Sequence, residues 1–282
     1  MTRASLEQPR IEVPPFDQWP WGRRTFVMGI INATPDSFSG DGLLGRVDEA
    51  VRRARAMVEA GADILDVGGE STRPGHQPVE AEEELRRVIP VIRAIREALP
   101  TVPISVDTNK AVVAEAALAA GATMINDVRG LTGDPDMAAV AARSGVPVVI
   151  MHDLEIRRAD ELIPRLIRDL AARIERALAA GVHWERIIID PGFGFGKEPE
   201  LNLLLLRRLR DLTVLGRPIL VGTSRKRTIG FVLGTPPEDR LEGTAATVAL
   251  SIANGADIVR VHDVRQMVRV VRMSDAVVRG TW

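Results

Sequence analysis

Residues 187–197, IIIDPGFGFGK, place a carboxylate at the point where a buried strand ends. Three consecutive isoleucines cannot alternate between core and solvent, so they predict a strand covered on both faces, as in a parallel sheet flanked by helices. Asp190 follows, and Pro191 and three glycines then let the backbone turn and approach a ligand closely. We interpret this stretch as the floor and lip of a pocket; the alternative is an acidic helix cap in an ordinary loop.

Polar residues also end the other predicted strands. One such group could simply cap a helix, but eight of them, several set inside the strand runs, indicate one shared site. In chain order they lie at residues 32–36 (NATPD), 70–75 (ESTRPG), 107–108 (DT), 126–127 (ND), 151–153 (MHD), 190 (D), 224–226 (SRK) and 260–263 (RVHD).

Lysine usage singles out three positions in the same regions. The chain has 37 basic residues but only three lysines, Lys110, Lys197 and Lys226, and each lies just after a strand-end motif. Because arginine is the usual cation of this chain, a compact ammonium at these positions suggests a specific use. We predict a ligand-binding role for Lys226 and ordinary surface charges at Lys110 and Lys197.

The polar residues divide into two chemical groups. Carboxylates and amides can pair with the N–H groups of a flat, nitrogen-rich heterocycle, whereas arginine and histidine suit an anion such as diphosphate, with a hard cation beside it. The first group consists of Asp107, Asn126 and Asp190, and the second of Asn32, Arg73, Arg260 and His262. We therefore predict a site with a ring on its floor and phosphates at its rim.

Repeated strand–helix units must position these residues. Several units join a glycine after a small-residue helix end to an apolar strand and then to a polar cluster, as in AGADILDVGGES, AGATMINDVRG and NGADIVRVHD. Eight strands alternating with eight helices, without a linker midway, predict a single (β/α)8 TIM barrel over residues 25–282. Residues 1–24 are expected to form an N-terminal extended arm or hairpin. A doubly wound open sheet is the alternative architecture.

Composition narrows the classes of partner and metal. The net charge of −1 and the absence of basic blocks argue against nucleic acid and anionic membrane as partners. No apolar run approaches the ~20 residues that span a bilayer, and the start lacks a signal-peptide pattern, so we expect a cytoplasmic protein. Without cysteine, and without HExxH spacing among its four histidines, the chain is expected to bind only a hard, oxygen-liganded metal.

The strand-end segments, in order, resemble those of the dihydropteroate synthases. The matching segments lie within residues 27–264 and read MGIINATPDSFSGDG, DVGGESTRPG, PISVDT, INDVRG, IIIDPGFGFGK, LVGTSRK and RVHDV. The resemblance implies a transferase with a (β/α)8 barrel, usually a homodimer, that acts in folate biosynthesis. Such an enzyme condenses 6-hydroxymethyl-7,8-dihydropterin diphosphate with 4-aminobenzoate, in the presence of Mg²⁺, to give 7,8-dihydropteroate and diphosphate.

The resemblance also implies roles for individual residues. Asn32 would bind the metal. The diphosphate would be bound by Arg73, Arg260 and His262, which with Lys226 form the predicted catalytic set. The pterin would contact Asp107, Asn126, Met151, Asp190, Lys226 and Arg260. The aminobenzoate would lie among Thr72, Pro74, Phe195 and Ser224.

One segment departs from the family pattern and keeps other functions open. After Met151 and His152 the family usually continues with a methionine and a glycine-containing loop, whereas this chain has DLEI at residues 153–156. A non-catalytic pterin-binding paralogue is therefore one alternative. Methyltransferases that pass a methyl group from methyltetrahydrofolate to a corrinoid are another, since they share the barrel and the pterin floor, although they do not need STRPG or SRK.

Overall fold

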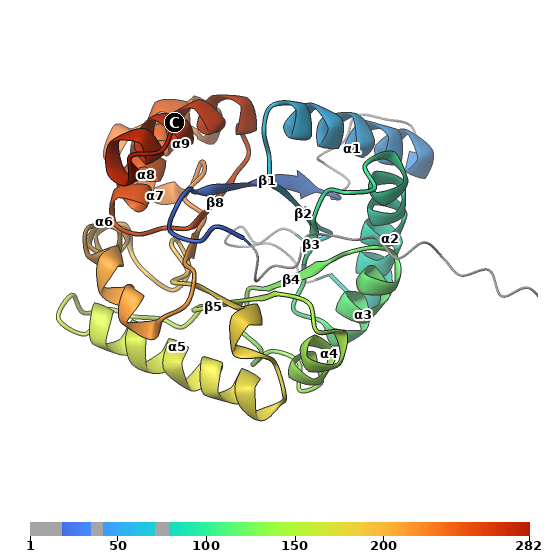
Figure 1. The fold of residues 1–282 in the computed structure, drawn as a ribbon, viewed down its shortest axis with the longest axis horizontal. Helices are drawn as coiled ribbons and strands as arrows, with labels where there is room; N and C mark the ends of the chain where they lie inside the picture. The colour runs from blue at the N-terminus through green and yellow to red at the C-terminus, as the bar shows by residue number, and fades with distance from the viewer. Residues whose placement is uncertain (1–18, 35–41, 71–78) are drawn as a thin grey trace, which may run out of the picture.

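The structure is a computed structural model that describes residues 19–34, 42–70 and 79–282. Strands lie at the centre and helices surround them (Figure 1). The strands are β1 (Phe26–Asn32), β2 (Ile64–Gly68), β3 (Ile104–Asp107), β4 (Met124–Asp127), β5 (Val148–Met151), β6 (Ile187–Asp190), β7 (Leu220–Val221) and β8 (Ile258–Val261).

The eight strands form one parallel sheet that closes on itself. Their order is β6-β5-β4-β3-β2-β1-β8-β7, so each strand pairs with its neighbour in the chain and β1 pairs with β8. A parallel bridge between Ile189 of β6 and Ile219, just before β7, joins the two ends of this order, and Ile189 N donates to Pro218 O at 3.0 Å. The predicted TIM barrel is confirmed, and the open sheet is excluded.

The helices follow the predicted alternation, with one addition. Helix α2 runs through Pro90 without interruption. The α-helices are α1 (Gly42–Glu59), α2 (Ala81–Ala98), α3 (Ala111–Ala119), α4 (Met137–Ser144), α5 (Leu162–Ala179), α6 (Pro199–Arg208), α7 (Arg227–Leu233), α8 (Leu241–Ala253) and α9 (Val264–Arg279). The described residues also form the 3-10 helices η3 (Trp184–Arg186), η4 (Leu209–Leu215) and η5 (Pro237–Asp239).

The prediction of eight helices omitted α7. This helix has seven residues, too few to show an apolar period. It ends at Leu233, and Gly234 follows at the C-cap position with φ of 70° in the left-handed region. It begins directly after the SRK motif, with Lys226 at its N-cap position. Within the described ranges, no helix is long and apolar enough to cross a membrane.

Two apolar layers stabilise the barrel. The larger layer lies between the strands and the surrounding helices and includes residues such as Val67, Ile92 and Leu170. The smaller layer fills the inside of the barrel at its base, the end where the strands begin. It contains Phe26, Met28, Ile64, Met124, Val149, Ile188, Leu220 and Ile258.

The start of the described chain closes the base of the barrel. Residues 19–24 form a bend and a turn, and Trp19 and Trp21 pack against the inner apolar layer. The ring centroid of Phe26 lies 4.4 Å from that of Trp19 and 5.1 Å from that of Trp21. The rest of the predicted arm, residues 1–18, lies outside the described residues, so the arm stays a prediction.

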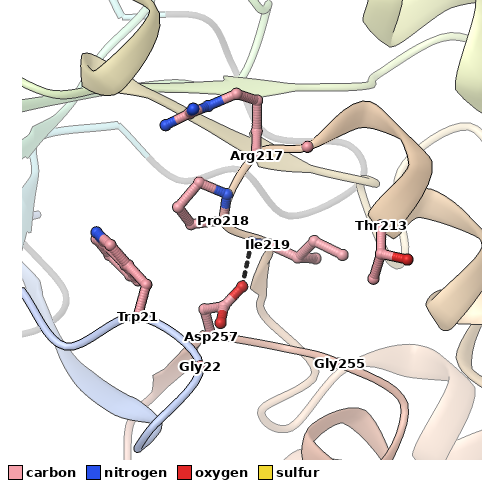
Figure 2. A pocket seen from close by; sticks show the side chains of 9 residues that line it. Trp21, Gly22, Thr213, Arg217, Pro218, Ile219, Gly255 and Asp257 are labelled. Carbon is pink, nitrogen blue, oxygen red and sulfur yellow. Dashed lines mark hydrogen bonds between the residues drawn. The ribbon is translucent and has the colours of Figure 1, made fainter.

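A pocket of about 430 Å³ also opens at the base (Figure 2). Trp21, Arg217 and Asp257 line it, together with residues that immediately precede β7 and β8. Asp257 accepts a hydrogen bond from Ile219 N at 2.9 Å, which joins the starts of these two strands. This pocket therefore lies at the end of the barrel opposite to the predicted site.

Candidate active site

Inward-facing polar side chains form a floor at the mouth of the barrel, where the strands end. Asp107 on β3 and Asn126 on β4 are register partners, and Met151 on β5 is the partner of Asp190 on β6. All four are buried. The strand ends thus bring the predicted ring-binding residues of four neighbouring strands to one level.

Arg260 of β8 connects this floor across the barrel. Its Nε donates to Asp66 Oδ2 and its Nη2 to Asp107 Oδ2, both at 2.6 Å. Asp66 also accepts a hydrogen bond from Asn126 Nδ2 at 3.2 Å. We had expected Arg260 against the ring and the diphosphate, and the structure places its guanidinium on the carboxylates of the floor.

Asp66 is a floor residue that the sequence analysis missed. It lies within β2 and is fully buried, and its Oδ1 has no hydrogen-bond partner among the described residues. The signal was present in the sequence, because a charged residue interrupts the apolar run ILDVG of a strand that is buried throughout. Its side chain points the same way as that of Ile64, two residues earlier, into the barrel.

Burial perturbs the titration of the floor. Burial is the main cause that raises the pKa of Asp107 to about 7; Arg260 lowers it and Asp66 raises it. Burial also raises the pKa of Asp190, against the effect of Lys226. Burial opposes the charge on Arg260, but Asp66 and Asp107 raise its pKa above the usual value. The floor therefore holds more acceptors than its own cations satisfy, and it suits a ligand rich in N–H groups.

Lys226 reaches over the glycine turn, which we define as residues 191–196. Its Nζ donates to Phe193 O and lies 4.4 Å from the ring centroid of Phe195. A Cβ at Gly194 would lie 2.8 Å from Lys226 Cδ, and the φ of Gly194 is +82°, so this position requires glycine. Burial lowers the pKa of Lys226 to about 8, and Asp190 opposes this effect.

The glycine turn separates its two aromatic rings. Phe193 is fully buried in the larger apolar layer, between the strands and the helices, whereas Phe195 is partly exposed beside Lys226. Asp190 Oδ1 accepts a hydrogen bond from Gly192 N at 2.7 Å, which leaves Oδ2 for a ligand. Phe195 therefore remains the aromatic residue of this turn that can contact a substrate.

His262 and Ser224 form the rim above β7 and β8. Ser224 Oγ lies 3.0 Å from His262 Nδ1 and accepts a hydrogen bond from His262 N at 3.2 Å. His262 is two residues after Arg260, so both side chains lie on the inner side of the barrel. This pair joins His262, a residue predicted to bind the diphosphate, to Ser224, a residue predicted to lie against the aminobenzoate.

Other predicted residues cannot be placed in this geometry. Thr72, Arg73 and Pro74 lie outside the described residues. Asn32 ends β1 at the mouth, is partly buried and makes no side-chain hydrogen bond to another described residue. No group of three or more His, Cys, Asp or Glu residues in the described ranges could hold a metal ion. The metal role of Asn32 therefore stays a prediction.

Comparisons with known proteins agree with this geometry. Residues 28–262 match the model of the pterin-binding enzyme family. The dihydropteroate synthase of Bacillus subtilis is 51% identical over 90% of this chain and 88% of its own length. A crystal structure of the Clostridium difficile enzyme, determined with pteroic acid, matches with a TM-score of 0.89 and 52% identity over 93% of this chain and 99% of that one.

The chain belongs to the dihydropteroate synthase family. A Xanthomonas albilineans member, determined with 4-aminobenzoic acid, is 47% identical with a TM-score of 0.85, over 90% of this chain and 93% of its own. The resemblance predicted from the strand-end segments is confirmed. As a member of this family, the protein is a transferase of folate biosynthesis.

The segment after β5 that departs from the usual dihydropteroate synthase pattern is tied to its surroundings. Asp153 forms ion pairs with Arg173 and, at 3.1 Å, with Arg129. Ile156 N donates to Gly196 O at 2.8 Å, which attaches this loop to the glycine turn. The loop after β5 therefore packs against the site instead of leaving the rim near β5 open.

The two remaining lysines differ from the prediction. Lys110 is partly buried and donates to Glu70 Oε2 and Glu84 Oε2, both at 2.6 Å. Glu84, on α2, is buried. Lys197 is buried with 9% of its surface exposed, so the prediction of a surface charge is wrong there. Its position inside the fold depends on β5 and β6 packing together, which the sequence around Lys197 does not reveal.

Proposed function

We propose that this barrel condenses 6-hydroxymethyl-7,8-dihydropterin diphosphate with 4-aminobenzoate, holding the pterin on the floor and the diphosphate at the rim. The observation that carries the proposal is the buried floor, where Arg260 joins Asp66 and Asp107 beside Asn126. Buried carboxylates without enough internal donors are suited to paired N–H bonds from an amidine-like ring edge. Neutral apolar rings would leave these oxygens unsatisfied.

Each floor residue has a distinct task in this proposal. Asp190 keeps Oδ2 for the ring N–H groups, since Oδ1 already accepts from Gly192 N. Asp107 and Asn126 supply an acceptor and an amide from the neighbouring strands. Lys226 donates to Phe193 O and leaves further N–H donors of its ammonium for the ring. Met151, buried at the end of β5, contacts a ring face.

The reaction is a substitution at the exocyclic methylene of the pterin. The aryl amine nitrogen forms the new C–N bond, the C–O bond to diphosphate breaks, and the amine proton passes to solvent or to the departing diphosphate. An aryl amine is already a nucleophile, so the barrier lies mainly in the departure of diphosphate. Arg73 and His262 stabilise the charge that develops on this leaving group, while Arg260 holds the floor carboxylates Asp66 and Asp107.

Mg²⁺ fits the chemistry of the rim. Asn32 offers an amide oxygen that no other described residue uses, and the diphosphate of the substrate offers the oxygen ligands that a hard cation prefers. When bound, the ion would neutralise charge on the diphosphate. Asn32 and the substrate would hold it.

We also propose a homodimer formed through α7, α8 and α9. Apolar side chains are exposed on these helices, which pack against one another. Phe231, Leu250 and Val277 are 56%, 55% and 73% exposed, a pattern typical of a protein interface. Leu250→Glu should convert the dimer to a monomer in light scattering, whereas Val214→Glu, at an exposed residue of η4, should not. Equal masses for both variants would reject this interface.

The activity test uses purified protein, both substrates and Mg²⁺. Release of diphosphate together with 7,8-dihydropteroate is the expected result. Pterin binding without product would favour a non-catalytic paralogue, and methyl transfer from methyltetrahydrofolate to a corrinoid would favour the methyltransferase. The cytoplasmic location expected from the sequence stays a prediction.

A further inference from the structure

Lys197 lies in a cage of acceptors between the glycine turn and the loop after β5. Its Nζ is 2.9 Å from Phe195 O, 3.3 Å from Gly192 O and 3.4 Å from His152 O. A fourth neighbour, His152 Nδ1, lies at 3.2 Å. Three of these four atoms are main-chain carbonyl oxygens, so the Lys197 side chain connects the backbone of the glycine turn to the backbone after β5.

The cage favours the ammonium form of Lys197. Burial is the main cause that lowers the pKa of His152 to about 4, so this imidazole is neutral. Its Nε2 then donates to Asp169 Oδ2 at 3.2 Å, and its Nδ1 accepts from Lys197. Burial also lowers the pKa of Lys197 to about 7. Acceptors alone surround Nζ, however, and only an ammonium supplies three N–H donors to them.

Lys197 bonds to the glycine turn where the backbone of the turn lies directly against the loop after β5. A Cβ at Gly192 would lie 1.8 Å from His152 O, so the turn and the loop after β5 touch through bare backbone. Phe195 N donates to Gly192 O at 3.0 Å, and both residues also accept from Lys197 through their carbonyls. Without Lys197, Phe195 O and His152 O would lose this donor, whereas Gly192 O would keep its bond from Phe195 N. The two lost bonds would favour another path for the turn.

The same turn carries two groups of the site. Phe195 presents its ring to Lys226 at 4.4 Å, and Phe193 O accepts a hydrogen bond from Lys226 Nζ. A shift of the turn would therefore move the aromatic wall and the anchor of Lys226 together. The floor carboxylate Asp107 and the amide Asn126 belong to other strands and would remain in place.

We propose that Lys197 is a positioning residue for the aminobenzoate subsite: it bonds the glycine turn to the loop after β5 and so fixes Phe195 beside Lys226. The proposal rests on the proposed synthase reaction, because it requires an aryl amine to bind at Phe195. It assigns to Lys197 a larger effect on the second substrate than on the pterin. The turn reaches the pterin only through Lys226 and the bond from Gly192 N to Asp190. The other floor residues, Asp107, Asn126 and Met151, lie on other strands.

Arg96 provides a matched control at the base of the barrel. It is a buried cation on α2 that donates to Gly121 O and Val102 O, each at 2.8 Å, and to Pro100 O at 2.9 Å. These carbonyls precede β3 and β4, at the end of the barrel away from the mouth. Arg96→Met therefore removes a comparable set of buried carbonyl bonds without touching the site.

The test compares steady-state kinetics of full-length wild type, Lys197→Met and Arg96→Met. In Lys197→Met we expect the KM for 4-aminobenzoate to rise about tenfold or more, and the KM for the pterin diphosphate to rise clearly less. Lys197→Gln keeps two N–H donors and should show a smaller rise. Arg96→Met should lower Tm and leave both KM values near those of wild type. Circular dichroism checks the fold of each variant.

Specific results would overturn the proposal. A folded Lys197→Met or Lys197→Gln with unchanged KM for aminobenzoate, or with both KM values raised equally, would remove the positioning role. The same selective rise in Arg96→Met would show a general effect of lost stability. If Lys197→Met does not fold, Lys197→Gln decides the question. Absence of product with wild type would instead reject the proposed function, and calorimetry of bare pterin would still test the floor.

Discussion

The base and the mouth of the barrel interior differ in chemistry although the same strands build both. On β2, Ile64 lies at the base and Asp66 two residues later at the floor of the mouth; on β6, Ile188 and Asp190 have the same relation. The same step separates Met124 from Asn126 and Ile258 from Arg260. Because side chains alternate along a strand, a residue two positions later faces the same side of the sheet but lies closer to the mouth.

This difference indicates how the fold divides its tasks. The base is apolar and closed by Trp19 and Trp21, so it contributes favourable burial. The floor buries Asp66 and Asp107 around one arginine, an arrangement that stabilises a fold less than apolar packing would. Substitutions at the base should therefore change stability, and substitutions at the mouth should change ligand binding.

The largest effect on stability is expected from truncating an apolar side chain at the base. Ile188→Ala leaves a cavity in the inner apolar layer and should lower the free energy of unfolding by about 2–5 kcal/mol. The pterin affinity of the protein that remains folded should change little, because Asp190 stays at the same position at the end of β6. Urea unfolding and calorimetry with bare pterin measure the two quantities. A large loss of affinity in folded protein would show that base and mouth are not separable.

Asp190→Asn should have the opposite pattern. An amide presents one oxygen where the carboxylate presents two, and loss of a charge-assisted bond costs about 1.5–3 kcal/mol, or about 10- to 150-fold in pterin affinity. Burial already raises the pKa of Asp190, so removing its charge should not lower stability. Calorimetry and thermal melts test this, and an unchanged affinity for pterin would remove Asp190 from the floor.

His262→Ala divides the mouth itself into rim and floor. The imidazole lies at the rim, with Nδ1 3.0 Å from Ser224 Oγ, so we expect weaker binding of the pterin diphosphate, by about 1–2 kcal/mol, and unchanged binding of the bare pterin. Ligand titrations with both compounds supply the comparison. Equal losses for the two ligands would mean that the rim and the floor act as one site.

A pH dependence of stability is expected from Asp107. Burial raises its pKa in the folded protein from 3.8 to about 7, so ionisation there costs stability. The contribution of this carboxyl is therefore most favourable below about pH 4 and is lost as the pH rises to about 7. Relative to Asp107→Asn, wild type should lose unfolding free energy between about pH 4 and pH 7 and then level off. If wild type instead gained stability relative to Asp107→Asn as the pH rises, the raised pKa would be contradicted.

The sequence by itself determined the barrel and most of the floor. Each βα unit is local, with an apolar run, a polar end and a helical period within about thirty residues, so patterns along the chain were sufficient. The same patterns brought Asp107, Asn126 and Asp190 to the strand ends. Residues 71–78 lie outside the described structure, so the roles of Thr72, Arg73 and Pro74 still rest on the resemblance alone.

Only the tertiary structure decided which charges meet. Arg260 and Asp66 are 194 residues apart, and their bond exists because β1 pairs with both β2 and β8 when the barrel closes. Lys197 has the sequence setting of a surface charge, yet the loop after β5 encloses it and supplies His152 O and His152 Nδ1. Partners of this kind depend on distances that form on folding, and neither composition nor period along the chain carries that information.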